Sequence, residues 1–277
     1  MKNQVFLIVL ALGFFVGPAS PPSCNDVLDT AIAVATASDS APKALSNSEI
    51  VEGLKTALNV GTDSSASTLS RNDGFYKDEA IKILLPPEAQ IIYDNKDKAL
   101  LKALKLDQKI ENAIMALNRA AEDAAKEAAP IFKEAIVGMS VSDGLSILKG
   151  KNPATAEMNS DFDSTAATAY LQSTTREKLH IAFTPVINAS LDKKLMGNYS
   201  ANQIWNTLST GYNGVANKSF GMIQPMENTN LGSYVCDKAL DGLFLKVGEQ
   251  EILIRRNPFA WAKTAVGNIL AKVFGKK

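Results

Sequence analysis

Residues 106–139 read LDQKIENAIMALNRAAEDAAKEAAPIFKEAIVGM, and this stretch decides the fold class. Its apolar side chains recur every three or four residues, which places them on one face of an α-helix: Leu106, Ile110, Ala113, Leu117, Ala120, Ala124, Ala128, Phe132, Ala135 and Met139. Much of this face is alanine, whose small side chain lets a neighbouring helix approach closely. The stretch therefore predicts the central helix of a bundle, and Pro130 is expected to kink or divide it.

The segments on either side repeat the helical pattern. Ser46 or Ser48 can cap a first helix that runs through Leu58 to a polar patch at 61–67. After the central stretch we expect further helices, from Ser140 or Ser142 to Leu148, from Asp163 or Ser164 to Ile187, from Ser200 to Leu208, from Leu231 to Val247 and from Pro258 to Phe274. A short helix is expected at Ile91–Tyr93, a loop at 213–228, and only 81–85 could also be a strand. The prediction is an all-α, single multi-helix, bundle-like domain with a central Ala-rich helix.

Composition and charge exclude several classes of function. The 277 residues carry 29 basic and 29 acidic side chains, one histidine and two cysteines. A neutral chain lacks the basic footprint of a nucleic-acid binder. One histidine, His180, and two cysteines cannot build a typical zinc site, so no metal is expected. The chain has neither a P-loop nor a GxGxxG motif, and we expect no cofactor.

The N-terminus is typical of an export signal. Lys2 precedes an apolar run at 5–16, which is too short to span a bilayer but fits a signal peptide. Cleavage could follow Ala19, leaving Cys24 free or paired with Cys236. Alternatively Ser23–Cys24 is a lipoprotein junction, although Pro21 and Pro22 fit a lipobox poorly. We favour lipidation of Cys24, because an exposed thiol is a liability in an oxidising compartment.

The expected organisation follows from this cleavage. Residues 1–23 are the signal peptide, 24–45 are a flexible Ala-, Ser- and Thr-rich tether, and 46–277 are the helical domain. The expected location is the periplasm or the outer membrane, with the protein attached to the membrane through its N-terminal lipid.

Several short motifs, in this order, resemble a known bacterial family. They are Arg71-Asn72-Asp73-Gly74-Phe75-Tyr76, Leu84-Leu85-Pro86-Pro87-Glu88, Leu117-Asn118-Arg119-Ala120-Ala121-Glu122, Ala129-Pro130-Ile131-Phe132, 139–143, Ile147-Leu148-Lys149-Gly150, Ala166-Ala167-Thr168-Ala169-Tyr170, Tyr234-Val235, 239–244 and 251–258. Together they are similar to the family of domain of unknown function 4197, over about residues 46–277. The resemblance implies an exported, envelope-located protein and supplies no activity. Residues 151–165 depart from the family pattern and are expected to be a surface insertion.

Polar side chains within apolar surroundings are the candidate site residues: Asp73, Asn118, Arg119, Glu122, Asp143, Asp241, Glu251 and Arg255. They could line a cleft, with carboxylates for acid–base chemistry or arginines for an anionic ligand. The interpretation we favour is a structural network of ion pairs and caps, in which Arg119–Glu122 and Glu251–Arg255 have helical pair spacings. In that network Asp73 forms a turn with Gly74, Asp143 caps its helix, and no residue is assigned as catalytic.

Three functions remain, in decreasing order of support. The first is a non-catalytic binding or scaffolding protein that contacts an envelope protein. The second is a carrier that holds a hydrophobic or lipid ligand between its helices. The third is a hydrolase that uses a carboxylate pair, which the scarcity of histidine and cysteine makes the weakest of the three.

Charge is concentrated at the C-terminus. Six basic residues and no acidic one follow Glu251, whereas residues 24–251 carry 22 basic and 29 acidic side chains. Within the last segment one face is apolar: Phe259, Ala262, Val266, Ile269 and Val273. Such a helix could lie on an anionic membrane, but a stripe of mostly Ala, Val and Ile is more typical of packing on the bundle. We therefore expect it to pack on the rest of the domain.

Overall fold

The computed structural model describes residues 46–89, 106–154, 162–194, 199–218, 220, 225 and 230–256. Its helices are α2 (Asn47–Leu69), the 3-10 turn η1 (Pro87–Ala89), α5 (Leu106–Ala124), the 3-10 turn η2 (Ala125–Glu127), α6 (Ala128–Gly138), α7 (Val141–Leu148), α8 (Ala166–Leu191), α9 (Ala201–Ala216) and α10 (Leu231–Arg256). Within these ranges no strand forms, and the only β-type pairing is an isolated bridge between Lys194 and Ser200. The fold is all-α, as predicted.

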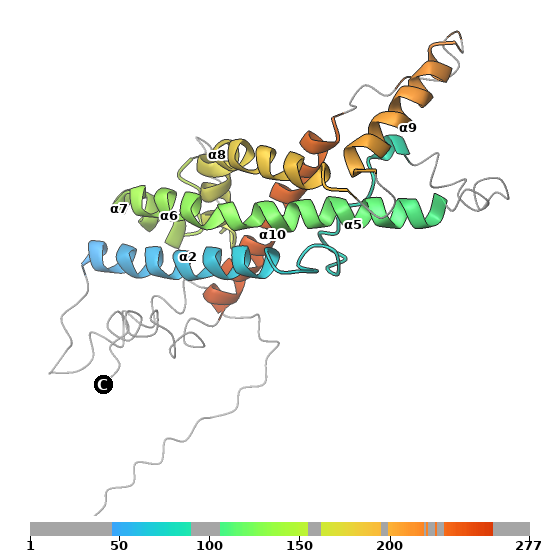
Figure 1. Ribbon diagram of the computed structural model, residues 1–277. Coiled ribbons are helices and arrows are strands. Elements are labelled where there is room, and N and C mark those ends of the chain that lie inside the picture. The colour runs from blue at the N-terminus through green and yellow to red at the C-terminus, as the bar shows by residue number, and fades with distance from the viewer. Residues whose placement is uncertain are drawn as a thin grey trace, which may run out of the picture. The chain divides into compact units, whose positions relative to one another are not determined.

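The helices pack as a bundle around α5 and α6. Helix α8 packs on α5, α6 and α10, while α2 packs on α6, α7 and α10. In Figure 1, α5 and α6 lie almost in line, α2 runs alongside them, and α10 crosses both. One continuous hydrophobic core joins these elements.

The Ala-rich stretch is the centre of the fold. Ala120, Ala121 and Ala124 have no exposed surface, and neither do Ala125 and Ala128. Side chains this small allow α8 and α2 to approach the backbone of the central helix closely. The large residue that follows on the same face, Phe132, packs edge-on against Phe244 of α10 with the ring centroids 5.8 Å apart.

The predicted interruption at Pro130 is present. Residues Ala125–Glu127 form a 3-10 turn that separates α5 from α6. Proline lacks a backbone N–H and its ring clashes with the carbonyl four residues earlier, which here belongs to Lys126. The break therefore lies where the proline removes the helical hydrogen bond.

Local sequence determines where several helices begin. Ser46 and Glu49 form a capping box at the start of α2, and Ser140 and Asp143 form another at the start of α7. Ser200 caps α9 by accepting a hydrogen bond from the Gln203 backbone N–H at 3.1 Å. Such caps satisfy backbone groups that have no partner within the helix.

Some predicted boundaries were wrong. Helix α2 continues through the polar patch at 61–67, where Thr62 and Ser65 bond to carbonyls one turn back and are buried. Helix α9 runs to Ala216 and α10 to Arg256, beyond their expected ends. The expected start of α8 at Asp163 or Ser164 is two or three residues early.

Other predictions fall outside the described residues. These are the signal peptide and tether at 1–45, the short helix at Ile91–Tyr93 and the helix at Pro258–Phe274. The ends of the expected insertion are described. Gly150, at a φ of 69°, accepts a hydrogen bond from the Asp163 N–H at 2.9 Å, which joins the two ends of this segment.

Candidate functional site

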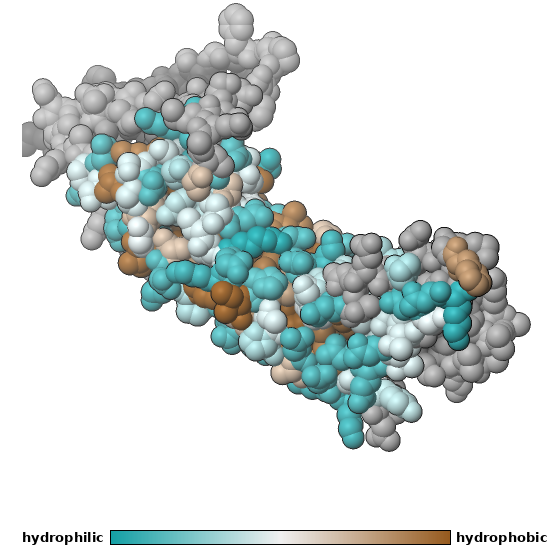
Figure 2. All heavy atoms as spheres, turned by 90° about the horizontal axis from the view of Figure 1, so that it is seen from above, coloured by the Kyte–Doolittle hydropathy of each residue, from teal (hydrophilic) through white to brown (hydrophobic). Residues whose placement is uncertain are grey.

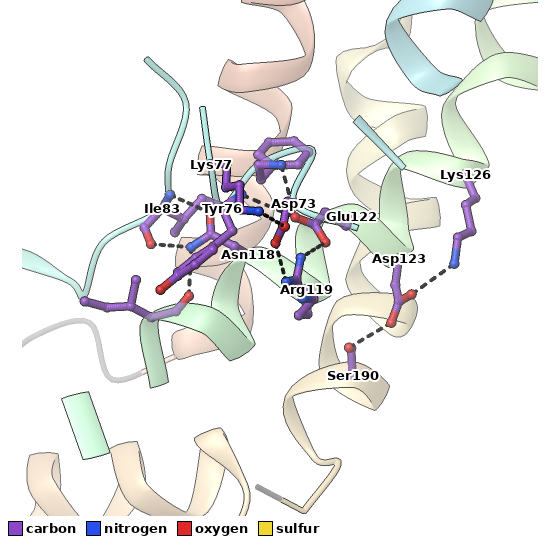
Figure 3. Close-up of polar contacts among 12 residues, drawn as sticks. Asp73, Tyr76, Lys77, Ile83, Asn118, Arg119, Glu122, Asp123, Lys126 and Ser190 are labelled. Carbon is purple, nitrogen blue, oxygen red and sulfur yellow. Dashed lines mark hydrogen bonds and ion pairs between the residues drawn. The ribbon is translucent and has the colours of Figure 1, made fainter. Parts of the chain in front are cut away.

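The first group of candidate residues surrounds the turn at 71–76. Asp73 has a φ of 69°, the left-handed conformation that the turn requires. Beyond it, the backbone N–H groups of Phe75 and Tyr76 donate to Glu122 Oε1 at 3.1 and 3.3 Å. Glu122 lies on α5 and is 3% exposed. A buried carboxylate thus caps the turn and joins the segment after α2 to the central helix, as Figure 3 shows.

Arg119 joins two carboxylates beside this turn. Its guanidinium donates to Glu122 Oε2 and to Asp73 Oδ1 (Figure 3). Lys77 also reaches Asp73 Oδ2, at 2.7 Å. Hydrogen bonds from Lys77 and Arg119 hold the pKa of Asp73 below its ordinary value. Arg119 therefore pairs with both carboxylates, and Lys77 adds a second basic partner for Asp73.

Asn118 extends the same attachment. Its amide accepts from the Ile83 N–H at 2.9 Å and donates to the Ile83 carbonyl at 2.8 Å. Asn118 is completely buried, and Ile83 is 2% exposed. The side-chain amide therefore pairs with extended backbone much as a neighbouring strand would. This explains the strand-like pattern at 81–85 in a segment that forms no sheet.

The second group lies where α10 meets the start of α8. Glu251 is 5% exposed and accepts from the backbone N–H groups of Ala167 at 2.9 Å and Thr168 at 2.7 Å. Thr165, at the N-cap position, makes no side-chain cap bond. Glu251 thus caps α8 from another helix, and sequence alone could not place this cap, because donor and acceptor are more than 80 residues apart.

Arg255 completes this second group. It donates to Glu251 Oε1 at 2.7 Å and to the Ile147 carbonyl at 3.0 Å. Its guanidinium lies 5.6 Å from the centre of the Phe162 ring, within cation–π distance. Arg255 therefore links α10 to Ile147 near the end of α7 and to Phe162.

The remaining candidates lie elsewhere. Asp143 belongs to the capping box of α7. Asp241 is 54% exposed in its side chain and pairs with Arg176 of α8 at 2.9 Å. The prediction of one network that joins Arg119, Glu122 and Asp241 to Glu251 and Arg255 is wrong. These residues belong to three separate groups: Arg119 pairs with Glu122 within α5, Arg255 pairs with Glu251 within α10, and Asp241 pairs with Arg176 of α8.

An ion cluster that sequence reasoning missed lies on the opposite side of α5. Asp123 accepts from Lys193 at 2.8 Å, Lys126 at 3.0 Å and Ser190 at 3.0 Å. Figure 3 shows Asp123 pointing away from Arg119, toward α8. Burial raises the pKa of Asp123, but hydrogen bonds from Lys193, Lys126 and Ser190 outweigh it and lower that pKa to about 2. The only local signal was the Asp123–Lys126 spacing.

The residues of this cluster also line an open surface hollow of about 480 Å³ between the α5–η2 region and α8. The hollow has an apolar part formed by Pro185, Val186 and Ala189, and Glu127 lies on its other wall. Its open form differs from the enclosed cavities that usually bury a small ligand.

Cys236 lies in the core beside the backbone of His180. Cys236 is a completely buried free thiol, and its burial raises its pKa. It contacts Thr184 Oγ1 and the His180 carbonyl, each at 3.8 Å. Cys24, the proposed lipidation residue, lies outside the described residues. Among the described helices, none combines the length and apolar character needed to cross a bilayer.

Comparison with known proteins gives one result. No curated protein and no solved structure matched the chain. A family model described as "Protein of unknown function (DUF4197)" matches residues 44–275, which includes every structural group above. The chain therefore belongs to this family of proteins of unknown function.

Proposed function

We propose that the protein is a non-catalytic binding or scaffolding component of the cell envelope, exported and attached to a membrane through lipid on Cys24. The proposal that the protein is not a catalyst rests on one observation: the buried carboxylates of Glu122 and Glu251 are already hydrogen-bonded within the fold. Glu122 and Glu251 each accept two backbone N–H groups and one arginine. A general acid or base must instead exchange a proton with a substrate within hydrogen-bond reach.

The described surface supports a macromolecular partner over a small ligand. The hollow beside Asp123 is open and is bounded by charged side chains of α5 and η2 and by Lys193, which follows α8. A hydrophobic ligand held between helices would be expected in an enclosed apolar cavity. An open hollow with an apolar part and a charged rim is instead typical of surfaces that contact other proteins.

The predicted export signal and the cysteine at position 24 support the proposed envelope location. A single acyl chain anchors a protein only marginally, so stable attachment requires the several chains of a mature lipoprotein. The test is intact-mass spectrometry of the protein purified from its own envelope. We expect a mature chain that begins at Cys24 and carries acyl chains.

The same preparation tests the role. A protein that co-purifies in fixed ratio would support scaffolding. A lipid or other apolar molecule that stays bound after the membrane lipids have been removed would instead support the carrier function. An unmodified chain that begins at Ser20 would refute the lipid anchor. The binding or scaffolding role would still be tested by the molecules that co-purify with the chain.

A further inference from the structure

Helix α8 carries an exposed stripe of apolar side chains. Ile181 is 65% exposed, and Pro185 and Ala189 are exposed at the two following turns. Residues four apart lie above one another on a helix, so the three form one continuous line. Pro185 and Ala189 also form part of the hollow described above, so the stripe continues into it.

A charged residue lies at each end of the stripe, and the two have opposite signs. Lys178 precedes it, with 57% of its side chain exposed, and the exposed Asp192 follows it. The five positions, Lys178, Ile181, Pro185, Ala189 and Asp192, are spaced symmetrically about Pro185, at four and seven residues on each side. When a second α8 is placed antiparallel to the first, apolar residues therefore face apolar residues, and each Lys178 faces an Asp192.

We propose that two copies of the chain associate through this stripe, with their α8 helices antiparallel and a two-fold axis at Pro185. In this arrangement Ile181 contacts Ala189 of the second copy, and Lys178 pairs with Asp192 of the second copy at both ends. A two-fold interface requires such a self-complementary surface. The proposal does not depend on the envelope role or on lipidation.

The side chains at the centre of the stripe are short. The central residues are proline and alanine, which lack long side chains and permit close approach of two helices. Seen from above in Figure 2, the molecule has apolar patches separated by hydrophilic side chains. The stripe spans only about 21 Å from Lys178 to Asp192, which predicts a weak dimer whose orientation is fixed by the terminal charges.

Cysteine cross-linking tests the axis. Pro185→Cys in the full-length chain places the two thiols at the two-fold axis, so mild oxidation should give a disulfide-linked dimer. Ser173→Cys is the matched control, because Ser173 is also exposed on α8 but twelve residues from the axis. The two copies of residue 173 would then be about 36 Å apart. We expect about tenfold more cross-linked dimer from Pro185→Cys, and equal yields would overturn the proposal.

Charge reversal tests the register. Lys178→Asp places like charges at both ends of the interface, as does Asp192→Lys, and each should weaken the dimer about tenfold in sedimentation velocity. The double variant should restore it. Lys178 also pairs with Glu134 of α6 at 2.8 Å, and Asp192 accepts a hydrogen bond from the Asn202 side chain at 2.8 Å, so each single variant also changes a contact within its own chain. Restoration by Asp192→Lys has no explanation within one chain, and a double variant as weak as the singles would contradict the two-fold pairing.

Discussion

Glu122 and Glu251 lie on different helices and make the same set of contacts. Each is buried, each accepts from two successive backbone N–H groups in a distant segment, and each pairs with an arginine one turn away on its own helix. A buried carboxylate is costly unless it is paired and hydrogen-bonded. These residues are therefore tied to the packing of the chain, and their polarity reflects helix-to-segment attachment.

Removing Arg119 should expose the cost of that burial. In Arg119→Met, Glu122 keeps its backbone donors but loses its counter-charge, so the free energy of unfolding should fall by about 2–3 kcal/mol in urea titration. Lys126→Met is the control, because Lys126 is exposed and Asp123 keeps Lys193; its effect should stay below about 1 kcal/mol. Unchanged stability together with loss of a bound ligand would instead favour a functional cleft.

Glu251→Ala should destabilise the start of α8. The change removes a helix cap and leaves Arg255, with 11% of its side chain exposed, without its carboxylate. We expect a loss of about 3 kcal/mol, together with faster hydrogen exchange near Ala167. Glu249→Ala, two residues away and paired on the surface with Lys246, should change stability by about 0.5 kcal/mol or less. Equal effects of the two variants would argue against the cap.

Asp123 should make stability depend on pH in the acid range. Its pKa is about 2 in the folded chain and 3.8 ordinarily, so its ion pairs stabilise the fold fully above about pH 4 and lose that effect as the pH falls toward 2. Asp123→Asn should therefore cost about 1–2 kcal/mol at pH 7 and progressively less between pH 4 and pH 2. Urea titrations of both proteins across this range provide the measurement, and a pH-independent difference would contradict the assignment.

Among the helices, the central one followed from periodicity and small side chains. The interruption at Pro130 and the capping boxes at Ser46 and Ser140 also follow from local chemistry. The cap of α8 by Glu251 and the pairing of Asn118 with Ile83 do not, because each joins segments far apart in sequence. Pair spacing thus identified Arg119–Glu122 and Glu251–Arg255, whereas their partners on other elements depended on the tertiary fold.

The close approach of helices to α5 predicts the effect of enlarging its alanines. Ala124 has no exposed surface, so Ala124→Leu must displace neighbouring side chains or backbone. Overpacking of this kind costs about 1–3 kcal/mol. Met115→Leu introduces the same side chain on the same helix at a position that is 39% exposed, and should cost less than about 0.5 kcal/mol. Thermal unfolding followed by circular dichroism compares the two, and a neutral Ala124→Leu would mean that the alanine face has spare room.

For the whole molecule, charge is divided unevenly along the chain. Residues 24–251 carry 29 acidic and 22 basic side chains, and the six charged residues after Glu251 are all basic. Opposite charges within one chain favour contact between its parts, although salt screens charges that lie far apart on the surface. This asymmetry and the apolar stripe from Phe259 to Val273 both bear on the role of the C-terminus.

Deleting Pro258–Lys277 should destabilise the entire domain if this segment packs on it. Burial of even half of its five apolar stripe residues would contribute about 3 kcal/mol or more, so the melting temperature should fall by several degrees. Replacing Lys263 and Lys272 with glutamine retains the stripe and removes charge, and should leave the melting temperature nearly unchanged. A membrane-bound segment predicts a different pair of results. The truncated chain would keep its melting temperature and lose binding to anionic liposomes, and the double glutamine variant would bind them more weakly because each lysine near the surface contributes about 1 kcal/mol. The two measurements together therefore assign the C-terminal segment either to the core or to the membrane.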